Sequence, residues 1–230
     1  MTRGRGGALD AEAGWDLIIP IKRLDAAKSR LASVDDALRQ RLALSFATDA
    51  CTAALAVPAV RRVLVVTEDP VVAAQLSQRG AQIVGETRGP GLNPAIEAGL
   101  DALEATGGLH RVAIMTGDLP AVSADEIGAA LAAATGHRLG VLADADGTGT
   151  VLLTADGAAT RVAATASAVR PVPRFGPGSF ERHWHAGHVP LPGNLPGLRR
   201  DVDTPSDLAQ ARRLGLGAVS RRTAETLVES

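Results

Sequence analysis

Short runs of apolar residues alternate with longer amphipathic stretches along most of the chain. The runs are almost continuously apolar, as is typical of strands that a parallel sheet buries on both faces. We expect strands at Leu17–Ile21, Val63–Val66, Ala81–Val84, Val112–Met115, Leu139–Ala143 and Thr150–Thr154. Helices are predicted at about Asp35–Ala56, Pro70–Arg79, Pro94–Thr106, Ser123–Ala134 and Thr204–Arg213. The alternation predicts an α/β fold whose mostly parallel sheet is covered by helices on both faces.

Sheets of this kind bind ligands beyond the carboxyl ends of their strands. The loops that follow Ile21, Val84, Met115 and Ala143 are therefore the candidate binding loops. The pattern weakens after the last predicted strand, and we expect the proline-rich stretch Pro171–Gly197 to be a long irregular segment. Loops of that length inside a compact domain are usually functional or mobile.

Length and composition narrow the classes of function. The 230 residues suit one domain, and the glycine-rich, polar residues 1–14 predict a flexible arm without a signal peptide. No apolar run approaches the roughly 18 residues that a membrane-spanning helix needs, so we expect a cytoplasmic protein. The net charge of −1 and the 2% aromatic content disfavour nucleic-acid binding. Cys51 is the only cysteine, which excludes zinc sites made of several thiolates. We expect it to be buried and structural.

A basic loop follows the first predicted strand. It contains both lysines of the chain, Lys22 and Lys28, together with Arg23 and Arg30. Four cations at the ligand-binding edge of a sheet favour a polyphosphate ligand, although a solvated basic loop is the alternative. The loop is neither a P-loop nor a Gly-x-Gly-x-x-Gly fingerprint, which disfavours Walker-type NTPases and NAD enzymes.

A second loop, Gly85–Asn93, is rich in glycine and precedes a predicted helix. Its glycines, Gly91 among them, let the backbone approach a ligand closely, and the Asn93 amide could recognise the edge of a base. Taken alone, the alternative that Asn93 only caps the helix is the stronger interpretation.

Three aspartates follow predicted strands or precede a helix. Asp118 comes after the fourth strand, and Asp201 and Asp203 alternate just before the helix at Thr204. Alternate residues of an extended segment point to the same side, and two carboxylates that close need a cation between them or a raised pKa. The three carboxylates together suit Mg²⁺, whereas turn or capping roles remain the alternative.

Two further segments could cradle an anion. Gly147–Thr150 offers small residues and hydroxyls, and Arg174–Ser179 adds a cation. Either could equally be a plain turn. His183, His185 and His188 have spacing that zinc or nickel could use, but exposed loop histidines are the favoured interpretation.

Six motifs follow one another along the chain. They are Lys22-Arg23 with Lys28-Ser29-Arg30-Leu31, Gly91-Leu92-Asn93, Gly117-Asp118-Leu119-Pro120, Gly147-Thr148-Gly149-Thr150, Arg174-Phe175-Gly176-Pro177-x-Ser179 and Asp201-Val202-Asp203-Thr204-Pro205. In this order the motifs resemble the CofC/FbiD guanylyltransferases of coenzyme F-420 biosynthesis, over about Trp15 to Leu216.

The resemblance implies a three-layer α/β/α nucleotidyltransferase domain of the GT-A or MobA-like kind at residues 15–216, followed by a C-terminal tail at 217–230. It implies transfer of GMP from GTP to a phosphorylated three-carbon acid, which is phosphoenolpyruvate in actinobacterial relatives and 2-phospho-L-lactate in archaeal ones. A downstream deazaflavin transferase would take the product, and a homo-oligomer is possible.

The same resemblance implies roles for individual residues. Mg²⁺ would be held by Asp118, Asp201 and Asp203, and the acceptor acid would be contacted by Thr150, Gly176 and Ser179. The triphosphate would face Lys22, Arg23, Lys28 and Arg30, which stabilise the departing pyrophosphate, whereas Gly91 and Asn93 would face the guanosine.

Several alternatives stay open at this point. They are another nucleotidyltransferase, such as a molybdenum-cofactor guanylyltransferase or a sugar-phosphate enzyme, and a non-catalytic GTP-binding regulator. A GT-A glycosyltransferase is disfavoured, because no clear D-x-D motif ends a central strand, and Asp144-Ala145-Asp146 is only the nearest candidate. A metal site at that motif would replace the assignment to Asp201 and Asp203.

Overall fold

The structure is a computed structural model of the whole chain, and it describes residues 14–28, 35–107, 109–160 and 169–226. Within these residues seven strands form one sheet in the order β3-β2-β1-β4-β6-β5-β7. The strands are β1 (Trp15–Pro20), β2 (Val60–Val66), β3 (Gln82–Val84), β4 (Arg111–Met115), β5 (Leu139–Ala143), β6 (Thr150–Asp156) and β7 (Val189–Pro190). The strands β1 to β4 are parallel to one another, whereas β6 runs antiparallel to β4 and β5.

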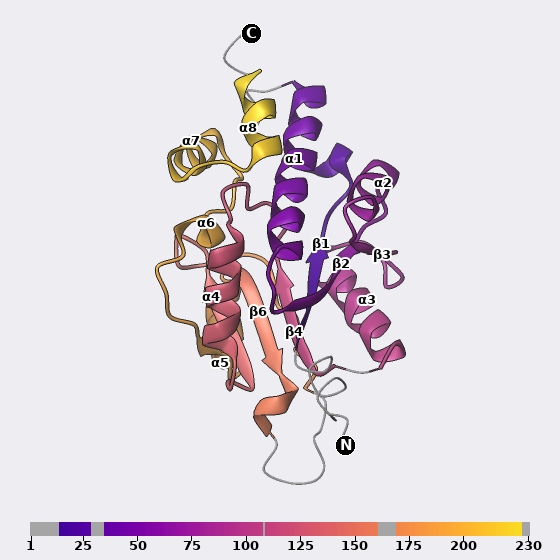
Figure 1. Cartoon of the computed structure of the whole chain (residues 1–230), viewed down its shortest axis with the longest axis vertical. Helices are drawn as coiled ribbons and strands as arrows, with labels where there is room; N and C mark the ends of the chain where they lie inside the picture. Colours follow the sequence, from indigo (N-terminus) through magenta and orange to yellow (C-terminus); the bar gives the residue numbers. More distant parts are fainter. Residues whose placement is uncertain (1–13, 29–34, 108, 161–168, 227–230) are drawn as a thin grey trace, which may run out of the picture.

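Helices cover both faces of the sheet, as Figure 1 shows. One apolar layer contains residues of α1 (Asp36–Leu55), α2 (Pro70–Ser77), α4 (Ala124–Ala134) and α6 (Pro196–Arg199). The opposite layer contains residues of α3 (Leu92–Ala105) and is joined by α5 (Ser179–His185). Short 3-10 helices lie at Leu24–Ala26 and Gly157–Thr160. The expected three-layer α/β/α architecture is confirmed.

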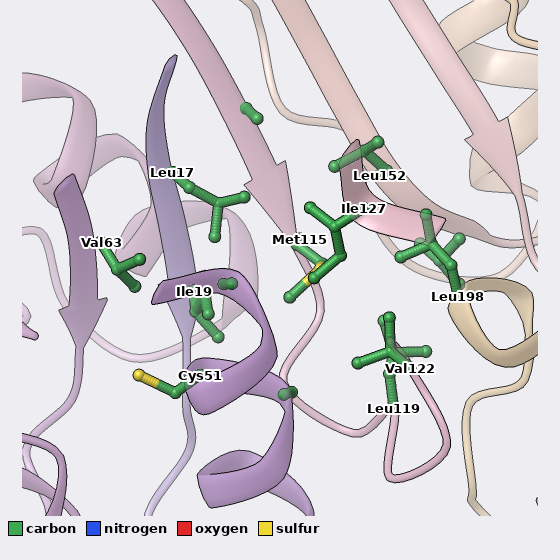
Figure 2. Close-up of a cluster of buried hydrophobic side chains, with 14 of the residues drawn as sticks. Leu17, Ile19, Cys51, Val63, Met115, Leu119, Val122, Ile127, Leu152 and Leu198 are labelled. Carbon is green, nitrogen blue, oxygen red and sulfur yellow. The ribbon is translucent and has the colours of Figure 1, made fainter. Parts of the chain in front are cut away.

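Side chains of β1 enter both layers. Leu17 and Ile19 are buried with Cys51 of α1 and Ile127 of α4, whereas Ile18 packs in the opposite layer. Figure 2 shows Cys51 beside Ile19, among the other side chains of the first layer. Burial raises the pKa of the Cys51 thiol to about 11, so this residue is the structural cysteine that the sequence predicts.

The C-terminal part of the chain packs on α1. A third apolar cluster joins Leu42 and Phe46 of α1 to α7 (Pro205–Leu214) and α8 (Ala218–Glu225). The buried Asp49 carboxylate accepts hydrogen bonds from the backbone N–H groups of Val219 and Ser220, at the start of α8. Residues 217–230, expected as a tail, therefore include a helix that is held on the domain.

The segment Pro171–Gly197 differs from its prediction as a long irregular segment. It contains α5, the short edge strand β7 and the start of α6. Glycine and proline interrupt the apolar periodicity here, so the elements are short and depend on tertiary packing. Among the described residues, no helix combines the length and the apolar character that crossing a membrane requires.

Candidate active site

The candidate site lies at the carboxyl edge of β1 and β4. Because β6 is antiparallel to β4, its first residue, Thr150, reaches this same edge. A cavity of about 320 Å³ opens there and is lined by the loop after β1, the loop after β4 and Asp203. Two of the predicted binding loops and the segment that carries Asp203 thus meet around one cavity, as expected at the carboxyl ends of neighbouring strands.

Hydrogen bonds fix the segments that carry the charged side chains. The backbone N–H of Leu24 donates to Asp69, and the Arg39 guanidinium donates to the carbonyl of Ala27, so the basic loop is tied at two points. The backbone N–H of Val202 donates to the carbonyl of Asp118 at 3.1 Å. This bond holds the segment from Asp201 to Asp203 against the loop after β4.

Lys28 stands between two of the predicted metal ligands. Its Nζ lies 2.6 Å from Asp118 Oδ2 and 3.1 Å from Asp203 Oδ1. Burial disfavours the ammonium charge, but the two carboxylates outweigh it and raise the pKa of Lys28. Burial likewise opposes the charge of Asp118, but the Lys28 ammonium outweighs it and lowers the pKa of that carboxyl. The pair is therefore ionised at neutral pH.

Asp201 completes the Lys28 cluster, a name used here for Lys28, Asp118, Asp201 and Asp203. Burial, and then the nearby charges of Asp118, Asp144 and Asp203, raise the pKa of Asp201 to about 7. Several carboxylates thus face one ammonium, and the cluster carries an excess of negative charge. Asp118 Oδ1 is buried without a hydrogen-bond partner.

No three carboxylate, imidazole or thiolate groups in the described part of the chain are arranged to hold a metal ion. The space between Asp118 and Asp203 is taken by the Lys28 ammonium. The role of these carboxylates as Mg²⁺ ligands stays a prediction, which the donor chemistry of the cluster supports.

The remaining cations of the basic loop are placed differently. Lys22 lines the cavity, whereas exposed Arg23 pairs with Asp25 at 3.2 Å. Arg30 lies outside the described residues. Of the predicted triphosphate contacts, the structure therefore brings Lys22 and Lys28 together at the cavity.

Asp144 shapes the turn between β5 and β6. Its carboxylate accepts hydrogen bonds from the backbone N–H groups of Thr148 and Gly149, at 2.9 and 2.7 Å. A Cβ atom on Gly149 would lie 2.3 Å from Asp144 Oδ2, so glycine is required for this close approach. The turn delivers Thr150 to the edge of the sheet, and the Asp144 carboxylate is already engaged there.

Thr150 is joined to α5 by a buried histidine. Its Oγ1 lies 2.9 Å from His183 Nδ1, and His183 Nε2 accepts a hydrogen bond from the backbone N–H of Arg174 at 2.9 Å. The prediction of exposed loop histidines is wrong for His183 and His188, which are both buried, whereas His185 is exposed. Burial and nearby cations lower the pKa of His183 to about 4, so the ring is neutral at physiological pH.

The predicted acceptor contacts are Gly176, in the loop from Arg174 to Gly178, and Ser179, the first residue of α5. Gly176 has φ of +124°, which a residue with a side chain rarely adopts, and the backbone N–H of buried Ser179 donates to its carbonyl. Asn93 binds the backbone of Phe175 through both its amide nitrogen and its oxygen, at 3.1 and 2.8 Å. Its predicted contact with guanosine stays a prediction, because the structure engages this amide in anchoring the loop.

Gly91 and Asn93 both lie at the start of α3. Gly91 is the N-cap, with φ of +122°. This conformation explains the glycine in structural terms, in addition to its predicted approach to a ligand.

The sequence pointed to His183 only through its spacing with His185 and His188, and it missed the buried role of this residue at the edge of the sheet. Its signal was weak because a histidine on a short helix in a proline-rich segment gives no periodicity. A buried imidazole with both ring nitrogens engaged is recognisable only once Thr150 and Arg174 are brought beside it.

Comparison with known proteins places this chain in a family. The profile of the family described as "Guanylyl transferase CofC like" matches residues 15–169. The chain belongs to this family. The nucleotidyltransferase activity predicted from its motifs is therefore confirmed as the class of enzyme, while the individual site residues stay predictions.

Curated relatives extend the match beyond the family profile. A protein of Geodermatophilus obscurus named "Phosphoenolpyruvate guanylyltransferase" is 45% identical over 90% of this chain and 92% of its own length. A protein of Thermomonospora curvata with the same name is also 45% identical, over 90% of this chain and 87% of its own length.

The fold has counterparts among solved structures. One from Desulfovibrio desulfuricans G20, whose name refers to nucleotide-diphospho-sugar transfer, covers 94% of each chain with a TM-score of 0.68 at 17% identity. At this identity the likeness supports the nucleotidyltransferase-like fold alone.

Proposed function

We propose that this guanylyl transferase moves GMP from GTP to phosphoenolpyruvate, which yields enolpyruvyl-diphospho-5'-guanosine and pyrophosphate. The observation that carries the proposal is the Lys28 cluster at the cavity, beside a separate neutral hydrogen-bonding site at Thr150. The names of the curated relatives support phosphoenolpyruvate as the acceptor. The product would enter coenzyme F-420 biosynthesis through the downstream deazaflavin transferase.

The reaction needs no protein nucleophile. A phosphate oxygen of the acid, already ionised at neutral pH, attacks the α-phosphorus of GTP and forms the new P–O bond. The bond between that phosphorus and the oxygen bridging to the β-phosphate breaks, and its electron pair leaves with pyrophosphate. The protein has to align two anions and neutralise their repulsion, which is positioning and electrostatic catalysis.

The cations of the loop after β1 suit the triphosphate end. Lys22 and Lys28 both line the cavity of about 320 Å³, and their charges would stabilise the departing pyrophosphate. Arg23 is exposed at the outer part of this loop and could reach the terminal phosphates once the Asp25 contact is exchanged. Arg30 keeps the same proposed role from its place in the motif.

The carboxylates of the Lys28 cluster fit Mg²⁺. Asp118 has a buried oxygen without a partner, and burial together with the neighbouring carboxylates raises the pKa of Asp201. A divalent cation would satisfy both groups. Asp118, Asp201 and Asp203 would hold the ion once Lys28 Nζ withdraws from them toward the triphosphate. Bound there, the ion would neutralise charge on the α-phosphate and on the acceptor phosphate.

The acceptor end is built from neutral donors. The Thr150 hydroxyl, the backbone around Gly176 with its positive φ, and buried Ser179 lie on the side of β6 and α5. Neutral donors bind an acid without adding another charge beside the metal and lysines, which leaves the shape and hydrogen bonds of the acid to decide selectivity.

The test is an incubation of the purified protein with GTP, Mg²⁺ and either phosphoenolpyruvate or 2-phospho-L-lactate. Pyrophosphate release and product mass are measured, with the next deazaflavin transferase and its acceptor added because an enolpyruvyl product is labile. Guanylylated phosphoenolpyruvate is the expected product. If only 2-phospho-L-lactate gives a product, it replaces phosphoenolpyruvate as the proposed acceptor. GTP binding without pyrophosphate release in the presence of either acid would favour the non-catalytic regulator.

A further inference from the structure

The hydrogen bonds of His183 determine where its proton lies. The backbone N–H of Arg174 can only donate, so His183 Nε2 must be the ring nitrogen that carries the lone pair. In a neutral imidazole the hydrogen then sits on Nδ1, and Nδ1–H donates to Thr150 Oγ1 across 2.9 Å. The low pKa of the fully buried ring agrees with this neutral tautomer.

The tautomer sets the direction of the Thr150 hydroxyl. Since Thr150 Oγ1 accepts from the imidazole, its own hydrogen is left to be donated to another group. His183 is the one side-chain partner that the described residues give this hydroxyl. A phosphate or carboxylate oxygen, which can only accept, is the partner that such a hydroxyl suits.

The same ring anchors the loop that carries Gly176. The Phe175 ring meets His183 edge-on at a centroid distance of 5.2 Å, and the backbone N–H of Phe180 donates to the carbonyl of Thr148. From the other side, His188 Nδ1 lies 3.0 Å from the His183 carbonyl, and the two imidazoles meet edge-on at 5.4 Å. One side chain therefore connects β6, the loop and α5.

We propose that His183 is a positioning residue that holds the Thr150 hydroxyl as a hydrogen-bond donor to the phosphorylated acid. The same imidazole keeps the loop around Gly176 in register with that hydroxyl. His183 acts through Thr150 and does not touch the reacting atoms. The inference rests on the proposed function, because the acid is the substrate that this end of the site would take.

Two substitutions separate the two bonds of the ring. A glutamine oxygen can reach the place of Nε2, so His183→Gln can keep the bond to Arg174 while it loses the donor to Thr150. An asparagine amide lies near the place of Nδ1, so His183→Asn can keep the donor and lose the bond to Arg174. His185→Gln, on the exposed part of the same helix, is the matched control.

Steady-state kinetics with GTP and phosphoenolpyruvate test the proposal. We expect His183→Gln to raise the KM for the acid about tenfold or more, the scale of losing one hydrogen bond to a charged group. The KM for GTP should change less than about twofold, and His183→Asn should raise the KM for the acid less than His183→Gln does. Equal increases of both KM values in His183→Gln would overturn the proposal.

A double-mutant cycle with Thr150→Val shows whether His183 acts through the hydroxyl. If it does, His183→Gln should add less than about twofold to the KM for the acid once Thr150 has become valine. Full additivity would overturn the positioning role and leave His183 a structural residue. A wild-type protein that converts no acid at all would overturn the proposed function instead.

A measurement on the wild-type protein covers the case in which the variants do not fold. The ¹⁵N chemical shifts of the imidazole nitrogens report the tautomer directly, with His183 distinguished from buried His188 by the contact of its ring with Phe175. We expect Nδ1 to be protonated at pH 7, both in the free protein and with phosphoenolpyruvate added. Protonation at Nε2 would overturn the inference.

Discussion

The Lys28 cluster and the Thr150–His183 pair lie at the same edge of one sheet but are built by opposite means. The Lys28 cluster gathers charges, with an ammonium 2.6 Å from one carboxylate and further acids nearby. The Thr150–His183 pair contains no charged group at neutral pH, because burial lowers the pKa of the imidazole to about 4. In the proposed reaction, the site has to neutralise charge at one end and select shape at the other, and we expect the two regions to divide these tasks.

The sharpest way to break this division is to remove a carboxylate. We expect Asp118→Ala and Asp203→Ala each to lower kcat at least about a hundredfold, the scale of losing an electrostatic stabiliser of the transition state. Pyrophosphate release at saturating substrates measures the loss. Asp125→Ala, an exposed aspartate in the first turn of α4, is the control and should retain wild-type turnover. Near wild-type rates in both site variants would remove the metal assignment.

Replacing the ammonium should affect one substrate more than the other. We expect Lys28→Ala to raise the KM for GTP by about tenfold or more and the KM for the acid by less, since a lost phosphate contact is a lost charged hydrogen bond. Initial rates over a grid of both substrates measure the two constants. Arg41→Ala, which removes an exposed cation from α1, serves as the control. An unchanged dependence on GTP would move Lys28 out of the triphosphate site.

The neutral state of His183 predicts how stability depends on pH. Its pKa falls from 6.5 in the unfolded chain to about 4 in the fold, so the unfolded state binds more protons between these values. The stabilising contribution is complete above about pH 6.5 and is lost as the pH falls toward 4. We expect the free energy of unfolding in urea to drop about 2 kcal/mol more between pH 7 and 5 in the wild type than in His183→Asn.

Exposed His185 provides the comparison for that experiment. His185→Asn should keep the pH dependence of the wild type, because the removed side chain lies in solvent. The difference between the two variants isolates the buried ring from the carboxylates that also titrate below pH 5. If both variants lose the same stability as the wild type, the imidazole is not held neutral by the fold.

The smallest expected effect concerns the turn that delivers Thr150. Gly149→Ala places a Cβ against Asp144 Oδ2, so we expect a loss of roughly 1–3 kcal/mol of stability and a raised KM for the acid. Gly147→Ala is the matched control, since it meets only backbone strain at φ of +76° and no neighbouring atom. Its expected loss is about 1 kcal/mol with an unchanged KM. Thermal unfolding and kinetics of the two variants decide between a steric and a purely conformational role.

The regular elements were predictable because their patterns are local. Continuous apolar runs identified β1 and β4 within two residues of their bounds. At the starts of α4 and α7, Ser123 with Glu126 and Thr204 with Asp207 form capping boxes, which are also local patterns. The helix α5, by contrast, has seven residues in a proline-rich segment, and its buried face is completed by β5, β6 and Phe175. No local period could indicate it, because the partners of its side chains come from other elements.

In the candidate site, too, some features could be predicted from the sequence and others depend on tertiary packing. The sequence by itself determined that Lys28, Asp118 and Asp203 come to one edge, since they follow strands or precede a helix at positions that a parallel sheet brings together. Only the tertiary structure decided that Lys28 lies between the two carboxylates, and that a buried histidine connects Thr150 to the loop after Arg174. These hydrogen bonds join residues 9 to 175 positions apart, so they depend on packing that no local pattern encodes.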